Sequence, residues 1–423
     1  GLEIFSMQKL LIRGKKPLSG SIFISGSKNA TLPILASSIL CKKVILKNVP
    51  LVKDVFTMIE LLNFIGLNIQ INKKDKSLKV KNLKNKLNTV APYKLVKTMR
   101  AGILVLGPLL AKYKKAKVSL PGGCAIGTRP VDLHLFALKK LGAKIKIRNG
   151  YIYASAKNGL VGNKIKFPSI SVGATENAII AAAQAKGKTT LINCAKEPEI
   201  SDLISFLRSL GCKIKESGRK IIVSGNFEPK TVSHNIMFDR IEAGTYLIAS
   251  ALIGKKISLH SLKTRTIKKE IETLKKMGVK MNVEKNKITV FQSPKIKKTN
   301  IVTSPYPGFP TDLQAQIMVL MTKAVGKSKI RENIFENRFM HVQELKRMGA
   351  KINVKNNNAT IEGPTNLSGA EVMATDLRAS VSLVLAGLIA ENRTIINRIY
   401  HLDRGYEKLE EKLKKCKAII RRV

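Results

Sequence analysis

The chain has 423 residues, of which 44% are hydrophobic and 5% aromatic. This length suits two or three domains, and the composition is typical of a globular protein with an aliphatic core. The formal net charge of +48 at pH 7 suggests nucleic-acid binding as one function. The lysines are dispersed through nearly every segment, however, and few aromatic residues stand among them. The charge therefore favours anionic small-molecule ligands over a nucleic acid.

The cysteine and histidine patterns exclude several kinds of site. No two cysteines have the Cys-x-x-Cys spacing, and their number is odd: Cys41, Cys124, Cys194, Cys212 and Cys416. This argues against a disulfide framework or a zinc site and favours a reducing compartment. No apolar run approaches the roughly 18 residues of a membrane helix, and no signal peptide is recognisable. We expect a cytoplasmic protein that does not insert into a membrane.

A short motif recurs along the whole chain: the end of an amphipathic helix, a glycine, and then alternating residues that enter a strand. Its glycines lie at intervals of 67 to 76 residues: Gly66, Gly142, Gly211, Gly278 and Gly349. A glycine at this place ends a helix in the left-handed conformation. A sixth copy has Lys417 in place of the glycine, so its helix is expected to end differently. Six such units predict two domains of three α/β units each.

Each unit is also expected to contain a second helical stretch, and four examples are rich in Ala, Leu, Ile and Val on nearly all sides. These stretches cover residues 174–185, 243–253, 313–325 and 377–390. A helix that is apolar all round is buried inside its domain. We therefore predict that these helices form the cores of the domains.

Two segments in the first half of the chain are candidates for binding or catalysis. Ser25–Pro33 contains a Ser-Gly-Ser turn followed by Lys28 and Asn29, and backbone N–H groups of such a turn can face an anion. Leu120–Pro130 reads LPGGCAIGTRP, which is a loop because its glycines and prolines break any helix or strand period. Nearby cations such as Arg129 lower the pKa of a loop thiol. Cys124 is either a reactive thiol or a small residue that fills a turn.

Four later segments complete the set, and six segments together resemble those of the UDP-N-acetylglucosamine enolpyruvyl transferases, a family that contains them in the same order. The later segments are Pro310–Gln316, Glu336–His341, Ala374–Ser380 and Asp403–Glu407. The resemblance runs from about Leu11 to the C-terminus. It implies two inverted α/β domains, each built from three repeats of a βαβαββ unit with buried helices, and an active site in the interdomain cleft. The implied domains are residues 1–27 with 239–423, which carry the general base, and residues 28–238, which carry the cysteine loop.

The resemblance also implies a reaction. Enzymes of this family transfer the enolpyruvyl group of phosphoenolpyruvate to the 3-hydroxyl of UDP-N-acetylglucosamine by addition and elimination, and they release phosphate. This transfer is the first committed step of peptidoglycan synthesis. The resemblance therefore also implies a role in cell-wall biogenesis, cell shape and cell division. Such chemistry needs a general acid, a general base and a cationic cradle.

Individual roles are carried over from the matching motifs. Cys124 corresponds to the family's proton donor, which also captures phosphoenolpyruvate covalently and is alkylated by fosfomycin. Asp312 corresponds to the general base; an alternative role for Asp312 or Thr311 is to cap the following helix. The phosphoenolpyruvate contacts are Lys28, which also counts as catalytic, together with Asn29, Arg129 and Arg404. Alone, any of these cations would be read as a solvated surface charge.

The resemblance further places the sugar nucleotide and a set of charges in the cleft. The implied UDP-sugar contacts are Arg100, Arg129, Pro130, Val131, Asp132, Leu133, Ser171, Val172, Asp312 and Ile334. Ser169 stands where the family often has a lysine. Arg338, Asp376 and Arg378 align with charged cleft residues, for which an ion pair between the domains is the alternative role.

Two other functions remain as alternatives. 5-Enolpyruvylshikimate-3-phosphate synthase shares the implied fold and chemistry but has no equivalent of the cysteine loop. A nucleic-acid-binding protein would need clustered cations with stacking aromatics, which the pattern lacks. No nucleotide-binding glycine motif or metal-binding histidine spacing occurs. We expect no metal, no cofactor and no obligate protein partner besides the two substrates, phosphoenolpyruvate and UDP-N-acetylglucosamine.

Overall fold

The computed structural model describes residues 8–84, 86–122, 131–335 and 339–423. The chain divides into two compact units. Unit 1 comprises Gly1–Ser25 and Phe238–Val423, and unit 2 comprises Gly26–Met237. The boundaries expected from the sequence lie within two residues of these positions.

The described strands of each unit form three sheets. In unit 1 the first sheet has the strand order β23 (Glu371–Met373), β24 (Arg393–Asn397), β1 (Leu10–Arg13), β25 (Ile419–Arg422). The second has the order β16 (Met281–Val283), β17 (Lys287–Phe291), β15 (Gly254–His260), β2 (Leu18–Phe23). The third has the order β18 (Ile296–Lys297), β20 (Ala324–Arg331), β22 (Asn358–Gly363), β21 (Lys351–Lys355), with β19 (Asn300–Val302) also paired to β20. In unit 2 the sheets run β10 (Lys164–Lys166), β11 (Lys188–Ile192), β13 (Lys220–Ser224), β12 (Lys213–Ser217); β14 (Val232–Asn235), β3 (Lys43–Lys47), β5 (Ser77–Lys81), β4 (Asn68–Asn72); and β6 (Val90–Ala91), β7 (Lys115–Ser119), β9 (Tyr151–Ser155), β8 (Lys144–Arg148).

All six sheets share one pattern of pairing. In each, one edge strand lies parallel to its neighbour and the remaining pairs along the sheet are antiparallel, as in β10–β11–β13–β12. β19 is a second parallel neighbour of β20. The sheet that contains β1 joins the start of the chain to its end, because β1 pairs with both β24 and β25. A shared pattern of this kind confirms the predicted six-fold repetition of an α/β unit.

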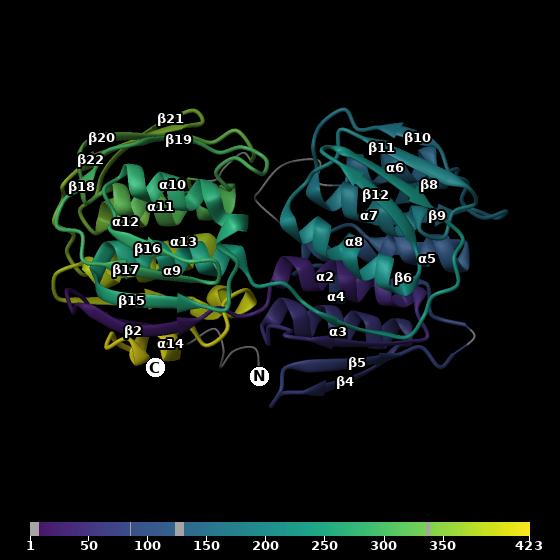
Figure 1. The fold of residues 1–423 in the computed structure, drawn as a ribbon, viewed down its shortest axis with the longest axis horizontal. Helices are drawn as coiled ribbons and strands as arrows, with labels where there is room; N and C mark the ends of the chain where they lie inside the picture. Colours follow the sequence, from purple (N-terminus) through teal and green to yellow (C-terminus); the bar gives the residue numbers. More distant parts are fainter. Residues whose placement is uncertain (1–7, 85, 123–130, 336–338) are drawn as a thin grey trace. The chain divides into compact units, whose positions relative to one another are not determined.

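Helices fill the interior of each unit. Those of unit 1 are α9 (Arg240–Ile253), α10 (Lys268–Lys276), α11 (Gln314–Met321), α12 (Val342–Arg347), α13 (Leu377–Ile389) and α14 (Leu409–Lys415), with the 3-10 turns η3 (Thr264–Ile267), η4 (Thr311–Leu313) and η5 (Ile399–Arg404). Those of unit 2 are α2 (Lys28–Ser37), α3 (Lys53–Ile65), α4 (Tyr93–Val96), α5 (Leu106–Tyr113), α6 (Asp132–Lys140), α7 (Val172–Ala182) and α8 (Pro198–Leu210), with η1 (Ser38–Leu40) and η2 (Arg100–Val105). Within unit 1, Figure 1 shows α11 and α13 enclosed by strands.

The predicted apolar helices are buried. Helices α9, α11 and α13 pack against one another in unit 1, and every residue of α11 is buried. Helix α7 packs in the same way against α5 and η2 in unit 2. The predicted helix over residues 313–325 is too long, however, because α11 ends at Met321 and β20 begins at Ala324. Ala324 and Val325, which the apolar pattern assigned to the helix, belong to β20, so composition alone does not mark the end of the helix.

The glycines of the repeated motif adopt the expected left-handed backbone. Their φ angles are 126° at Gly66, 101° at Gly142, 117° at Gly211, 89° at Gly278 and 103° at Gly349. The sixth copy does not end differently, contrary to the prediction, since Lys417 itself takes a φ of 77°. A residue with a Cβ pays about 1–2 kcal/mol for this conformation. The repeat geometry therefore persists where its usual residue is missing.

Candidate active site

Four of the predicted site residues lie outside the described part of the chain: Cys124, Arg129, Pro130 and Arg338. The others fall into two groups, one in each unit.

Lys28 is the first residue of α2. Ser27 caps this helix, its Oγ accepting a hydrogen bond of 3.0 Å from the N–H of Ala30. The Lys28 Nζ lies 3.1 Å from Asp54 Oδ2, and both side chains are largely buried. Asn29 is exposed beside it. The ammonium group is thus held at a helix N-terminus by a carboxylate that carried no signal in the sequence.

His134 and Asn177 join three segments of unit 2. The Asn177 Nδ2 donates to the carbonyl oxygen of Ile103 and lies 3.0 Å from His134 Nδ1, while its Oδ1 accepts from the N–H of Gly107 at 2.8 Å. Because Oδ1 takes the Gly107 N–H, the amino group faces His134. Nδ1 of His134 is therefore an acceptor, and the ring proton is on Nε2. Asn177 thereby connects α7 to α6, η2 and α5.

The His134 ring remains neutral and lies against the start of α7. Burial, together with the positive charge of Arg100, lowers the pKa of His134 to about 4. A Cβ at Gly173 would come within 3.0 Å of the ring, so the imidazole occupies the space where a side chain would otherwise stand. The structure thus brings Arg100, the first turn of α6 and the first turn of α7 together around one ring.

The start of α7 is capped by Ser171, whose Oγ accepts from the N–H of Ala174 at 3.2 Å. Val172 follows it and is exposed, as are Asp132 at the start of α6 and Ser169 before the cap. Val131, in contrast, is buried. The predicted sugar-nucleotide residues of unit 2 that the structure describes therefore converge on helix starts, where backbone N–H groups favour anions.

In unit 1, Asp312 lies in η4 and forms an ion pair with Arg378 of α13. Arg378 donates to Asp312 Oδ1 through Nε at 3.1 Å and also through Nη2. Burial is the largest single influence and would lower the pKa of Arg378. The charge and hydrogen bonds of Asp312, together with the charge of Asp376, more than offset burial, so the pKa of Arg378 is raised. The helix-capping alternative is wrong, because neither η4 nor α11 has a side-chain cap. Asp376 does cap a helix, since its Oδ1 accepts from the N–H of Ala379 at the start of α13.

A buried network of hydrogen-bonded polar side chains holds the segment that carries Asp312. Gln316 Nε2 donates to the backbone oxygen of Asp312 at 3.0 Å and to Thr245 Oγ1 at 3.1 Å. The Thr245 hydroxyl lies 2.7 Å from the hydroxyl of Tyr406, and burial raises the pKa of Tyr406. Tyr406 follows shortly after Arg404, the last residue of η5. The network therefore joins the segment that carries Asp312 to the one that carries Arg404.

The four described cysteines are buried. Burial raises the pKa of Cys41, Cys194 and Cys212 to about 12 in each case and also raises that of Cys416. Each of them is therefore a thiol at neutral pH, which makes it unreactive toward electrophiles.

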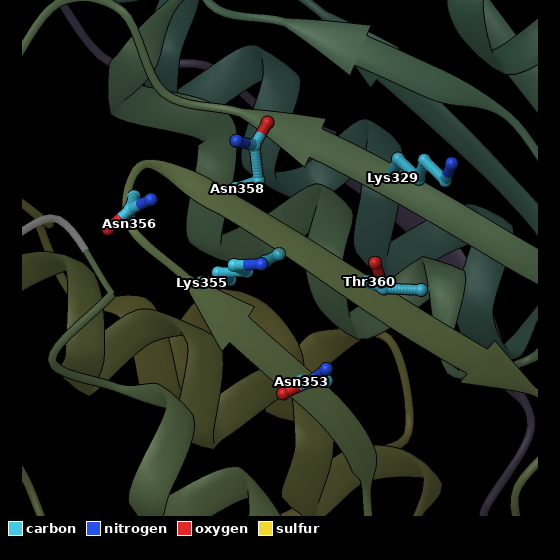
Figure 2. A pocket seen from close by; sticks show the side chains of 7 residues that line it. Lys329, Asn353, Lys355, Asn356, Asn358 and Thr360 are labelled. Atoms are coloured by element: carbon cyan, nitrogen blue, oxygen red, sulfur yellow. The ribbon is translucent and has the colours of Figure 1, made fainter.

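Other kinds of site are not found among the described residues. No group of three His, Cys, Asp or Glu side chains there can hold a metal ion. One hollow of about 380 Å³ lies on strands β20 to β22 of unit 1 and is lined by lysine, asparagine, alanine and threonine residues (Figure 2). None of the predicted site residues lines it. Nor is any helix in the described part of the chain long and apolar enough to span a membrane.

Comparisons with known proteins place the chain in a family. Residues 12–413 match the family model of EPSP synthase (3-phosphoshikimate 1-carboxyvinyltransferase). The UDP-N-acetylglucosamine 1-carboxyvinyltransferase of Pelagibacter ubique is 59% identical, and the enzyme of that name from Rickettsia canadensis is 52% identical. Each match covers 99% of this chain and 100% of the relative.

Solved structures with lower sequence identity share the fold. The enolpyruvyl transferase NikO from Streptomyces tendae superposes with a TM-score of 0.89 at 23% identity, covering 99% of both chains. An EPSP synthase from Acinetobacter baumannii superposes with a TM-score of 0.79 at 18% identity, covering 99% of this chain and 100% of that one. The chain belongs to the EPSP synthase family of enolpyruvyl transferases and, within it, to the UDP-N-acetylglucosamine 1-carboxyvinyltransferases.

Proposed function

We propose that this protein transfers the enolpyruvyl group of phosphoenolpyruvate to the 3-hydroxyl of UDP-N-acetylglucosamine and releases phosphate. The observation that carries the proposal is the full-length match, at 50% to 59% identity, to relatives named for this transfer. Shikimate 3-phosphate is the second candidate acceptor, because the family model is described by it. Solved EPSP synthases are only 17% to 18% identical to this chain, so the UDP-sugar is favoured.

We assign the proton donor to Cys124. Its thiol proton goes to the methylene carbon of phosphoenolpyruvate while the sugar oxygen bonds to the adjacent carbon, which gives a phospho-ketal with a methyl group. Loss of a methyl proton and departure of phosphate then restore the double bond. The assignment is supported by the other four cysteines, which are buried thiols. Of the five, Cys124 is therefore expected to be the one that captures phosphoenolpyruvate or reacts with fosfomycin.

Labelling by fosfomycin tests this assignment. We expect mass spectrometry to find one adduct, on Cys124. Cys124→Asp keeps an acid at this position but removes the soft nucleophile. It should retain activity and escape the label, whereas Cys124→Ser should be severely impaired. An adduct on Cys41, Cys194, Cys212 or Cys416, with Cys124 unmodified, would overturn the assignment.

We assign the general base to Asp312. Arg378 donates both of its hydrogen bonds to Oδ1, and this geometry fixes the plane of the carboxylate. We infer that Oδ2 accepts the proton of the sugar hydroxyl. Arg378 then acts as an orienting residue, since a guanidinium holds a carboxylate in a defined geometry.

We assign the binding of phosphoenolpyruvate to Lys28, Asn29, Arg129 and Arg404. Lys28 supplies a compact charge at the N-terminus of α2, where the helix dipole also favours an anion. The arginines offer forked donors that match a carboxylate or a phosphate. These residues come from both units, so both units are needed for the reaction.

We assign the UDP-sugar to residues from both units as well. Arg100, Val131, Asp132, Leu133, Ser171 and Val172 belong to unit 2, together with Arg129 and Pro130, and Asp312 and Ile334 belong to unit 1. Support comes from the convergence of Arg100 and the starts of α6 and α7 on His134. Arg338, Asp376 and Arg378 complete the proposed set as charges near the substrates; Arg378 pairs within its own unit.

In the cell, the proposed reaction belongs to peptidoglycan synthesis in the cytoplasm. It uses two small-molecule substrates, with no nucleic acid and no obligate protein partner. The experiment that tests the function is phosphate release from phosphoenolpyruvate with each acceptor in turn. We expect release with UDP-N-acetylglucosamine and none with shikimate 3-phosphate. The reverse result would contradict the proposal.

A further inference from the structure

Glu332 is a buried carboxylate that none of the assignments above includes. It stands directly after β20, at the end of the strand, and is only 3% exposed. Few acidic side chains are buried to this degree unless hydrogen bonds satisfy them. Its partners therefore indicate what the residue does.

Four donors converge on the two carboxylate oxygens of Glu332. Oε1 accepts from the hydroxyl of Thr311 at 2.8 Å and from Gln314 Nε2 at 3.3 Å. Oε2 accepts from the hydroxyl of Thr303 at 2.6 Å and from the backbone N–H of Ile334 at 3.0 Å. Hydrogen bonds to a carboxylate are stronger than neutral ones, so this single side chain fixes three chain segments at once.

The two oxygens hold different parts of the proposed site. Thr311 and Gln314, on Oε1, flank the turn that contains Asp312, the proposed general base. Ile334, on Oε2, is a proposed sugar-nucleotide contact. The Thr303 hydroxyl strengthens the Oε2 side, because it also accepts from the N–H of Asn333 at 2.9 Å. Since a carboxylate is planar and rigid, the position of one side is coupled to that of the other.

We propose that Glu332 is a positioning residue that fixes the position of the general base relative to that of the sugar-nucleotide contact. The inference rests on the proposed function, because it concerns the same acceptor sugar. Glu332 does not touch substrate in this account. It acts through Thr311 on Asp312 and through its own Oε2 on the backbone of Ile334. The Oε1 side therefore governs turnover, and the Oε2 side governs affinity for the UDP-sugar.

Isosteric variants separate the two sides. Thr311→Val removes one bond on Oε1 and is expected to lower kcat about 3- to 10-fold. The KM for UDP-N-acetylglucosamine should change less than kcat, although Asp312 is also a proposed contact of the sugar. Thr303→Val removes one bond on Oε2 and is expected to raise that KM by a similar factor with kcat unchanged. Glu332→Met removes all four acceptor contacts at similar volume. It should lower kcat about 10- to 100-fold and raise the KM for the UDP-sugar, because small displacements of catalytic groups are costly.

The matched control is Glu362→Met, on the neighbouring strand β22, where the glutamate is exposed; it should behave as wild type. The KM for phosphoenolpyruvate should also stay constant in every variant. Kinetic constants are compared per folded molecule, checked by circular dichroism. If Glu332→Met does not fold, the two threonine variants decide the question.

The outcomes distinguish this inference from the function on which it rests. Wild-type protein that does not turn over UDP-N-acetylglucosamine overturns the proposed function and the inference with it. Active wild type together with threonine variants that match it in both kcat and KM overturns the inference alone. Threonine variants that change kcat and KM equally, on both sides of the carboxylate, also overturn it, since the two oxygens would then not act on different parts of the site.

Discussion

The predicted site residues of unit 1 are held by charged groups, whereas the predicted sugar-nucleotide segments of unit 2 are held by neutral groups. Lys28 of unit 2, which is paired with Asp54, is not part of those segments. In unit 1, Asp312 is paired with Arg378, and the Glu332 carboxylate receives four hydrogen bonds. In unit 2, the segments converge on the Asn177 amide and the His134 imidazole, which hydrogen-bond to each other.

This difference between charged and neutral supporting groups matches the role proposed for each region. A general base needs a carboxylate with a fixed plane, and a guanidinium supplies that orientation. Arg100, proposed to bind a sugar diphosphate, needs a neighbour that does not neutralise it. A carboxylate in place of His134 would pair with Arg100 and weaken its attraction for an anion. The neutral imidazole supports the segment without this loss.

The largest expected effect is at the charged region. Asp312→Asn keeps the shape of the side chain but removes its ability to take a proton. We expect kcat to fall by about 10²- to 10⁴-fold, with UDP-N-acetylglucosamine still bound in a calorimetric titration. The control is Asp75→Asn, at an exposed turn of unit 2. Turnover within about threefold of wild type would mean that Asp312 is not the base.

The second prediction concerns the neutral region. Asn177→Ala leaves the Gly107 N–H, the Ile103 carbonyl and His134 Nδ1 without their partner. We expect a loss of roughly 2–4 kcal/mol in the free energy of unfolding and a higher KM for the UDP-sugar. The control is Asn68→Ala, at an exposed position of β4. Measured in the same urea titrations, it should cost no more than about 0.5 kcal/mol. Equal losses of unfolding free energy in the two variants would show that Asn177 does not hold these segments together.

The third prediction is that one buried group in each unit makes stability depend on pH, with opposite signs. His134 has its pKa lowered from 6.5 to about 4, chiefly by burial. The unfolded chain therefore binds a proton here that the folded chain does not, and this contribution to stability is lost as pH falls from 6.5 toward 4. Its full size is roughly 3 kcal/mol. His134→Gln should remove it.

Glu242 of unit 1 should act the other way. Burial raises its pKa from 4.5 to about 7, although Lys412 opposes the shift. The folded chain binds the extra proton, so this contribution to stability is lost as pH rises from 4.5 toward 7. Urea titrations at several pH values check both variants. If Glu242→Gln and His134→Gln changed the pH slope in the same direction, the comparison between the two regions would fail.

The smallest effect is expected away from both regions. Lys329 and Lys355 line the hollow on the outer strands of unit 1 (Figure 2), and neither contributes to the proposed chemistry. Lys329→Gln and Lys355→Gln should leave kcat and both KM values unchanged and alter stability by less than about 0.5 kcal/mol. A fall in turnover comparable with that of Asp312→Asn would show that the active region has been placed wrongly.

Much of the architecture could be predicted because it rests on local signals. Glycines such as Gly211 mark helix ends through a backbone conformation that other residues adopt at a cost, and uniformly apolar stretches mark buried helices. The same signals failed where two structures suit one composition. Ala324 and Val325 suit a helix as well as β20, the strand to which they belong, and Lys417 adopts the left-handed conformation without being a glycine.

The supporting residues of the site had no such signal. Asn177 contacts Gly107 across 70 positions in the sequence, and Glu332 contacts Thr311 across 21. Each is an isolated polar residue with no periodic pattern around it. Only the packing of distant segments shows that its donors and acceptors are satisfied. Motifs thus pointed to the residues proposed to touch substrate, while the residues that hold them required the structure.

The most direct test of the account is proton NMR of the product formed from phosphoenolpyruvate and UDP-N-acetylglucosamine in D₂O. Addition and elimination through Cys124 deliver a solvent deuteron to the methylene carbon, and a methyl group forms before a proton is lost. We therefore expect an enolpyruvyl ether of the UDP-sugar with deuterium in its vinyl methylene. A product whose methylene carries no deuterium, or the absence of product with this acceptor, would contradict it.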